Sequence, residues 1–249
     1  MQGGNRKLRL LIIRHGDPDY AADSLTEKGR REAALLAERL AKLDVAAFYM
    51  SPLGRARDTA APALRKMNRT AKVYEWLEEF PPQINRPDYG PGKTLVWDWL
   101  PQDWTAEGDY FLRDKWREAQ VMREGGVGEA YDRVVQGFDT LLAEHGYVRE
   151  GEYYRAEHPN RDTVVIFCHF GVECVLLSRL MNVSPMILWH HACALTSSVT
   201  TLVTEERRQG KAVFRMNAFG DTAHLYAAGE EPSFAARFCE TFDSGERHD

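Results

Sequence analysis

The sequence has few cysteines and no long apolar run. Its four cysteines among 249 residues show neither the C-x-x-C spacing of metal and redox motifs nor the density of a disulfide scaffold. We therefore expect reduced thiols and a cytoplasmic protein. The longest apolar stretch, residues 164–181, is interrupted by His169, Glu173 and Arg179, and the run at residues 8–13 is too short for a signal-peptide core. These features predict no membrane span.

Basic clusters are also absent from the sequence. The formal net charge is −5, and no block of lysine or arginine is long enough to follow a nucleic-acid backbone, so we expect no nucleic-acid partner. An anionic substrate would have to be bound by a local group of arginines. The sequence leaves the oligomeric state open.

The pattern that is present alternates apolar runs with helical spacing. Residues 8–13, 45–50 and 163–168 are short continuous apolar runs, typical of strands buried on both faces of a sheet. Thr26 can cap a helix that runs to about residue 43, and a second helix is expected over residues 53–67. This order predicts an α/β fold with a mostly parallel sheet covered by helices on both faces.

Further elements follow in the second half of the chain. A helical pattern ends at His145-Gly146, where glycine suits the left-handed residue after a helix. Another helix is expected over residues 172–181. Residues 196–204 and 211–216 are interpreted as a closing hairpin, with Gln209-Gly210 in its turn.

Residues 80–126 interrupt the alternation. This segment contains five prolines and four of the six tryptophans: Trp97, Trp99, Trp104 and Trp116. Because linkers are not rich in aromatic residues, we interpret it as an insertion of loops and short helices within a single domain that spans residues 1–249. The segment directly follows Glu79, one of the candidate site residues described below. We therefore expect it to form a cap that shapes a substrate pocket and favours a sizeable apolar or planar group.

Polar residues follow the expected strands at one edge of the sheet. Arg14 and His15 follow the first strand, Arg55 follows the second, and His169 ends the strand over residues 163–168. Glu79 follows a short expected strand at residues 71–74. Each of these residues, taken by itself, could equally have a structural or surface role. Together they form a candidate site, because strand ends of an α/β sheet gather functional residues.

Five motifs together resemble the histidine phosphatase superfamily, which is also called phosphoglycerate-mutase-like: Arg14-His15-Gly16, Leu25-Thr26-x-x-Gly29-Arg30, Ser51-Pro52-x-x-Arg55-Ala56, Leu77-x-Glu79 and His169-x-Gly171. The resemblance covers residues 8–80 and 160–204. It implies a three-layer α/β/α sandwich and an enzyme that needs no metal and no cofactor.

The resemblance also implies roles for individual residues. His15 would be the nucleophile, Arg14, Arg55 and His169 would bind the phosphate, and Glu79 would donate a proton to the leaving group. Two guanidinium groups suit the charge of a phosphoryl group in transfer, and nearby arginines favour the neutral, nucleophilic form of a histidine.

The resulting prediction is a phosphomonoester hydrolase that acts on a small phosphorylated organic substrate through a phosphohistidine on His15. Two alternatives remain: a phosphoglycerate-type mutase and a non-catalytic phospholigand-binding module. Many members of the family continue the first motif with threonine and asparagine, whereas this chain has Asp17-Pro18-Asp19-Tyr20, so the mutase contacts do not carry over. Glu78 remains an alternative to Glu79, and a structural role is favoured for His190 and His191.

Overall fold

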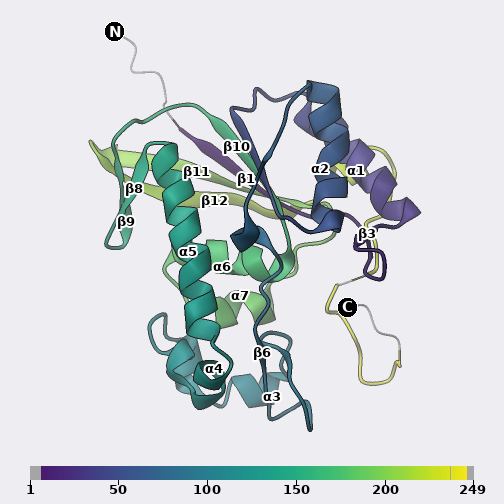
Figure 1. The fold of residues 1–249 in the computed structure, drawn as a ribbon, viewed down its shortest axis with the longest axis vertical. Helices are drawn as coiled ribbons and strands as arrows, with labels where there is room; N and C mark the ends of the chain where they lie inside the picture. The colour runs from purple at the N-terminus through teal and green to yellow at the C-terminus, as the bar shows by residue number, and fades with distance from the viewer. Residues whose placement is uncertain (1–6, 236, 246–249) are drawn as a thin grey trace.

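An eight-stranded sheet runs through the centre of the computed structural model, which describes residues 7–235 and 237–245 (Figure 1). Its strand order is β5-β4-β10-β1-β11-β12-β9-β8. The strands of this sheet have the following bounds: β1 (Arg9–Arg14), β4 (Ala47–Met50), β5 (Lys72–Val73), β8 (Tyr147–Glu150), β9 (Tyr153–Ala156), β10 (Thr163–Cys168), β11 (Val199–Arg208) and β12 (Lys211–Asp221). Two short two-stranded ladders lie outside it: β2 (Pro18–Asp19) with β3 (Ser24–Leu25), and β6 (Gln83–Ile84) with β7 (Thr94–Leu95).

The α/β class is confirmed, but the expectation of a mostly parallel sheet is wrong. Strands β5, β4, β10 and β1 pair in parallel, whereas β1–β11, β11–β12, β12–β9 and β9–β8 pair antiparallel. The expected hairpin turns at Gly210, which has a φ of +75°, and adds two antiparallel strands. A second hairpin over residues 147–156 went unpredicted, because its four-residue strands mix buried and exposed positions without clear alternation.

Helices cover both faces of the sheet. Leu11 and Ile13 of β1 pack against α1 (Glu27–Leu40) and α2 (Gly54–Met67). Leu10 and Ile12 belong to the cluster that includes α5 (Val127–Glu144) and α6 (Phe170–Met181), on the opposite face. Since successive side chains of a strand point to opposite faces, this burial explains why the run is continuously apolar.

The helix ends follow the expected local chemistry. The Thr26 hydroxyl accepts a hydrogen bond from the Gly29 amide at 3.1 Å and caps α1. Helix α5 ends just before His145, and Gly146 has a φ of +87°. Helix α7 (Pro185–His191), which was not predicted, begins at the capping residue Ser184.

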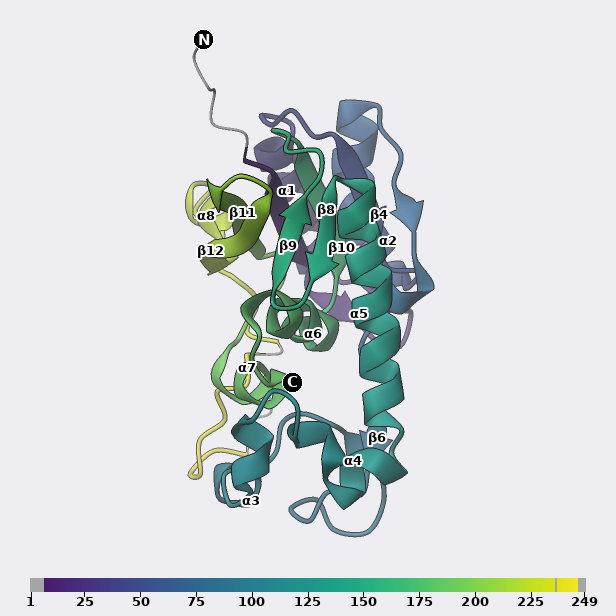
Figure 2. The ribbon, with the colours of Figure 1, turned by 90° about the vertical axis from the view of Figure 1, so that its left-hand side faces the viewer.

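The insertion contains the expected loops and short helices, and also the β6–β7 ladder, which was not predicted. Its helices are α3 (Pro101–Trp104) and α4 (Gln120–Glu124), with 3₁₀ turns between them. Figures 1 and 2 show these elements at the end of α5 that lies away from the sheet, next to α7. All four tryptophans of the insertion are buried in the same cluster as α5 and α6. Trp189 of α7 joins them, with its ring 5.8 Å from that of Trp116 and 6.1 Å from that of Trp97.

Candidate active site

Strand β1 places His15 at the carboxyl edge of the sheet. The His15 side chain is 2% exposed, and its backbone amide donates to the Cys168 carbonyl at the end of β10. Its ring Nδ1 lies 2.8 Å from the Gly16 carbonyl oxygen. Because a carbonyl can only accept, Nδ1 carries the proton in this hydrogen bond. The lone pair is then on Nε2, the nitrogen available for nucleophilic attack.

His169 lies beside His15 and is also buried. The two ring centroids are 5.1 Å apart, and His169 Nε2 is 2.7 Å from the Ser51 hydroxyl. Ser51 follows β4, and His169 follows β10, so three adjacent parallel strands deliver their terminal residues to one place. The structure brings these residues together as the strand-end argument predicted.

The pKa values of both histidines lie well below the ordinary value. Burial is the largest cause of the lowered pKa of His15, followed by the positive charge of Arg14, while the Gly16 carbonyl opposes the shift. Burial also lowers the pKa of His169, as do the neighbouring His15 and the two arginines. Both rings are therefore neutral at neutral pH.

Arg14 and Arg55 approach the site from two different elements. Arg14 Nη1 donates to the Ala194 carbonyl at 2.5 Å, and its guanidinium lies 5.6 Å from the centroid of the Phe170 ring. Arg55 lies in the first turn of α2, and its Nη1 donates to Asp23 Oδ1 at 2.8 Å. Asp23 also accepts from the Gly54 amide at 2.6 Å, which fixes the start of the helix. The sequence analysis did not identify Asp23 as a site residue. Its only signal was its place in the loop after Gly16, where this chain departs from the family motif.

Glu79, not Glu78, faces the site. The Oε1 atom of Glu79 accepts from the backbone amides of Phe80 at 2.8 Å and Val172 at 3.1 Å. The other carboxyl oxygen receives neither of these bonds. Oε1 of Glu78 instead lies 3.8 Å from Nη1 of Arg133 on α5, and Glu78 does not line the catalytic cavity. Burial raises the pKa of Glu79, although the Phe80 amide and the charge of Arg14 oppose this shift.

Gly171 permits a close approach of two side chains to α6. It lies in the first turn of α6, and a β-carbon there would be 2.6 Å from Glu79 Oε1 and 2.7 Å from the Trp97 ring. A larger residue would displace the carboxyl or the indole.

Arg14, Arg55 and Glu79 line a cavity of about 290 Å³ together with Tyr20, Leu95, Trp97, Asp98, Phe170 and Phe238. His15 and His169 are buried and are not among the lining residues. The insertion, which directly follows Glu79, contributes Leu95, Trp97 and Asp98 to this lining. Trp99 and Trp104 do not line this cavity. Phe238 comes from the C-terminal part of the chain and was not predicted, because nothing in its local sequence marks it.

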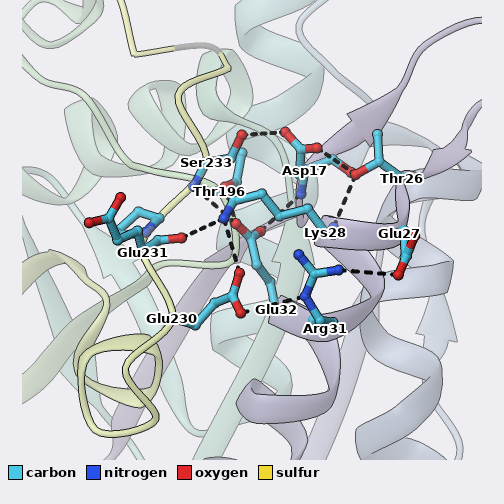
Figure 3. Close-up of polar contacts among 12 residues, drawn as sticks. Asp17, Thr26, Glu27, Lys28, Arg31, Glu32, Thr196, Glu230, Glu231 and Ser233 are labelled. Atoms are coloured by element: carbon cyan, nitrogen blue, oxygen red, sulfur yellow. Dashed lines mark hydrogen bonds and ion pairs between the residues drawn. The ribbon is translucent and has the colours of Figure 1, made fainter.

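A buried polar network holds the loop that follows His15 (Figure 3). The Glu32 carboxylate accepts from the Asp17 amide at 3.0 Å, the Thr196 hydroxyl at 3.0 Å and the Ser233 amide at 3.2 Å. Asp17 in turn accepts from the hydroxyls of Thr26 and Ser233. Segments far apart in the sequence are thereby fixed to the same loop.

Glu173 is a further buried carboxyl that the sequence did not reveal as part of this region. It lies one helical turn after His169 and is 1% exposed, and neither carboxyl oxygen has a well-formed hydrogen bond to a described residue. Burial raises its pKa to about 7, and Glu79 adds to the shift, whereas the neighbouring Thr200 hydroxyl and Arg14 oppose it. The four-residue spacing from His169 was the available signal.

His190 has a structural environment, and His191 lies at the surface. Nε2 of His190 accepts from the Trp99 amide at 3.1 Å, and its Nδ1 lies 2.7 Å from the Met186 carbonyl. Its ring stacks on Trp104 at 4.8 Å, and burial lowers its pKa to about 4. His190 therefore connects α7 to the insertion.

Residues 7–235 and 237–245 contain no group of three or more histidine, cysteine, aspartate or glutamate side chains that could hold a metal ion. They also include no helix with the length and apolar character needed to cross a membrane.

Comparison with known proteins agrees with this fold. Residues 10–217 match the histidine phosphatase superfamily, branch 1, and the chain belongs to this family. It is a phosphatase of this superfamily.

Two such relatives act on small phosphorylated molecules, as their names state. The chain is 29% identical over 198 residues to the glucosyl-3-phosphoglycerate phosphatase of Mycobacterium tuberculosis, covering 74% of this chain and 79% of that protein. It is 24% identical over 229 residues to phosphoserine phosphatase 1 of Hydrogenobacter thermophilus, covering 88% and 94%. The solved phosphoserine phosphatase of Entamoeba histolytica shares the fold, with a TM-score of 0.56 and 18% identity over 88% of this chain and 99% of that chain.

Proposed function

We propose that this phosphatase hydrolyses phosphate monoesters without a metal ion, through a phosphohistidine on Nε2 of His15. The observation that carries this proposal is the contact of His15 Nδ1 with the Gly16 carbonyl, which leaves Nε2 unprotonated in a ring that burial keeps neutral. A neutral imidazole is a competent nucleophile toward phosphorus.

In the first step, His15 Nε2 attacks phosphorus and the bond from phosphorus to the ester oxygen breaks. Arg14, Arg55 and His169 bind the non-bridging oxygens, where negative charge is spread in the transition state. Glu79 donates a proton to the departing alkoxide, which is a poor leaving group without it. The raised pKa of Glu79 supports this role, because it extends the pH range in which the carboxyl is protonated.

In the second step, water attacks the phosphohistidine. Glu79, now a carboxylate, accepts a proton from that water, and the bond from phosphorus to nitrogen breaks. Inorganic phosphate leaves, and both His15 and Glu79 return to their starting forms. Hydrolysis is favoured over mutase chemistry because the described residues that line the cavity include only two arginines, with no second basic group for a second phosphate.

The substrate class that we propose is a small organic phosphate whose organic group contacts Trp97. The Trp97 ring lines the cavity together with the two phosphate-binding arginines, and the names of the relatives indicate small phosphorylated metabolites. The test is steady-state hydrolysis of p-nitrophenyl phosphate in EDTA. We expect full activity in the wild type and its loss in His15→Ala. Loss of wild-type activity in EDTA would refute the metal-independent mechanism.

A further inference from the structure

The family match ends at residue 217, but the chain continues along the site. After the short helix α8 (Ala223–Tyr226), the C-terminal segment comprises residues 227–235 and 237–245. Figures 1 and 2 show it running from beside α1 toward the end of the molecule that holds the insertion. It therefore passes the carboxyl edge of the parallel strands.

Several polar contacts fix this segment to the loop that follows His15. Ser233 is 4% exposed, its hydroxyl donates to Asp17, and its amide donates to Glu32 at 3.2 Å (Figure 3). Lys28 of α1 donates to Glu230 at 3.0 Å. Arg237 Nε donates to the Ser233 carbonyl at 2.7 Å. The Arg237 contact lies within the segment, so the segment is anchored to the rest of the chain at Glu230 and at Ser233.

These anchors deliver Phe238 to the catalytic cavity. The Phe238 ring lies 5.2 Å from the Phe170 ring at an interplanar angle of 38°, and Phe170 in turn lies beneath the Arg14 guanidinium. Phe238 and Trp97 both line the 290 Å³ cavity. Phe238 also lines two neighbouring cavities, of about 730 Å³ and 360 Å³, so it stands where the catalytic cavity meets its surroundings.

We propose that Phe238 is a specificity-determining residue, and that the C-terminal segment completes the active site for phosphate esters carrying a planar, unsaturated organic group. The inference rests on the proposed function, since it places the organic group of the ester outside the phosphate pocket formed by the two arginines. Phe238 supplies an aromatic face from one segment and Trp97 another from the insertion. Aromatic rings favour offset or edge-to-face contact with a planar group over contact with a short alkyl chain.

The test compares 2-phenylethyl phosphate with ethyl phosphate, whose leaving groups are both primary alkoxides. We expect Phe238→Ala to lower the ratio of kcat/KM between the aromatic and the small ester by about three- to tenfold, the effect of losing one aromatic contact. The change should lie mostly in kcat/KM for the aromatic ester, with ethyl phosphate little affected. Phe238→Leu retains an apolar side chain without the ring, and we expect it to lower the ratio as well.

Phe242→Ala is the matched control, because Phe242 belongs to the same segment and is fully exposed. It should leave the ratio unchanged. An unchanged or increased ratio in Phe238→Ala, in protein that unfolds at the wild-type temperature, would overturn the inference while leaving the phosphatase function intact. A wild-type protein that hydrolyses neither ester would overturn the proposed function and this inference with it.

Discussion

At the scale of single residues, Arg55 shows how the site is prepared for an anion. Its guanidinium is held by Asp23 and lies 5.4 Å from the centroid of the Tyr20 ring, rather than pairing with Asp58 on its own helix. A donor positioned in advance needs little reorganisation in the transition state. We expect Arg55→Ala to lower kcat/KM by about 10²–10³-fold. Steady-state kinetics of Arg57→Ala, an exposed neighbour on α2, provide the control. Similar losses in both variants would contradict the role of Arg55.

Glu79 and His15 together predict the pH dependence of the reaction. The reaction needs His15 neutral, and the lowered pKa of His15 places the acid limb of the pH profile below the ordinary histidine pKa. The reaction also needs Glu79 protonated, and the raised pKa of Glu79 places the alkaline limb of the profile above the ordinary glutamate pKa. We therefore expect a bell-shaped profile of kcat/KM against pH, with its maximum on the acid side of neutrality. A profile that rises steadily to alkaline pH would contradict this pair of roles.

The identity of the acid is tested by substrates with different leaving groups. Glu79→Gln should slow the hydrolysis of alkyl phosphates strongly and that of p-nitrophenyl phosphate less, because p-nitrophenolate hardly needs a proton. Glu78→Gln should change neither, since Glu78 lies beside Arg133. Equal losses on both substrates in Glu79→Gln would indicate that the acid is another residue.

Glu173 predicts a pH dependence of stability. Its pKa of about 7 in the folded protein lies above the ordinary value of 4.5, so the folded state binds the proton more tightly than the unfolded state. This stabilisation is complete below the unfolded pKa and is lost as the pH rises through about 7. The wild type therefore loses stability as the pH rises, whereas Glu173→Gln has no such titrating group. Between about pH 5.5 and about pH 8.5, the free energy of unfolding of Glu173→Gln should rise by about 2 kcal/mol relative to that of the wild type. Urea denaturation of both proteins at several pH values measures this change. A difference in the free energy of unfolding that is constant with pH would contradict the raised pKa of Glu173.

At the scale of elements, the insertion divides its aromatic residues between the cavity and the core. Trp97 lines the catalytic cavity, whereas Trp104 packs between Phe111 and the histidines of α7. We expect Trp97→Ala to lower the ratio of kcat/KM between a bulky and a small ester. Trp104→Ala should leave the ratio unchanged but lower the free energy of unfolding by about 3–5 kcal/mol, the usual effect of removing a buried tryptophan. If Trp97→Ala leaves the ratio unchanged, the insertion does not shape the substrate pocket.

The parallel half of the sheet and its helices could be predicted because each element has a local signal. The buried strands are continuous apolar runs, and α1 begins at a capping threonine. The hairpin β8–β9 could not be predicted in the same way, because its strands are short and lie at one edge of the sheet.

At the scale of the whole molecule, the site residues that could be predicted from the sequence differ from those whose positions depend on contacts between distant segments. Arg14, His15, Arg55 and His169 were predictable as a group, since strand ends of a parallel sheet converge whatever the intervening chain does. Asp23 and Phe238 were not predictable. Their positions depend on tertiary contacts, namely the pairing of Asp23 with Arg55 and the anchoring of the C-terminal segment by Ser233, which leave no periodic trace in the sequence.

The most direct test of the mechanism is rapid-quench trapping with a radiolabelled phosphate ester. The account predicts an acid-labile, base-stable phosphoprotein that carries the label on His15. His15→Ala should form none, whereas His191→Ala, which changes an exposed histidine, should form the normal amount. A phosphoprotein of wild-type yield in His15→Ala, or label on another residue of the wild type, would contradict the account.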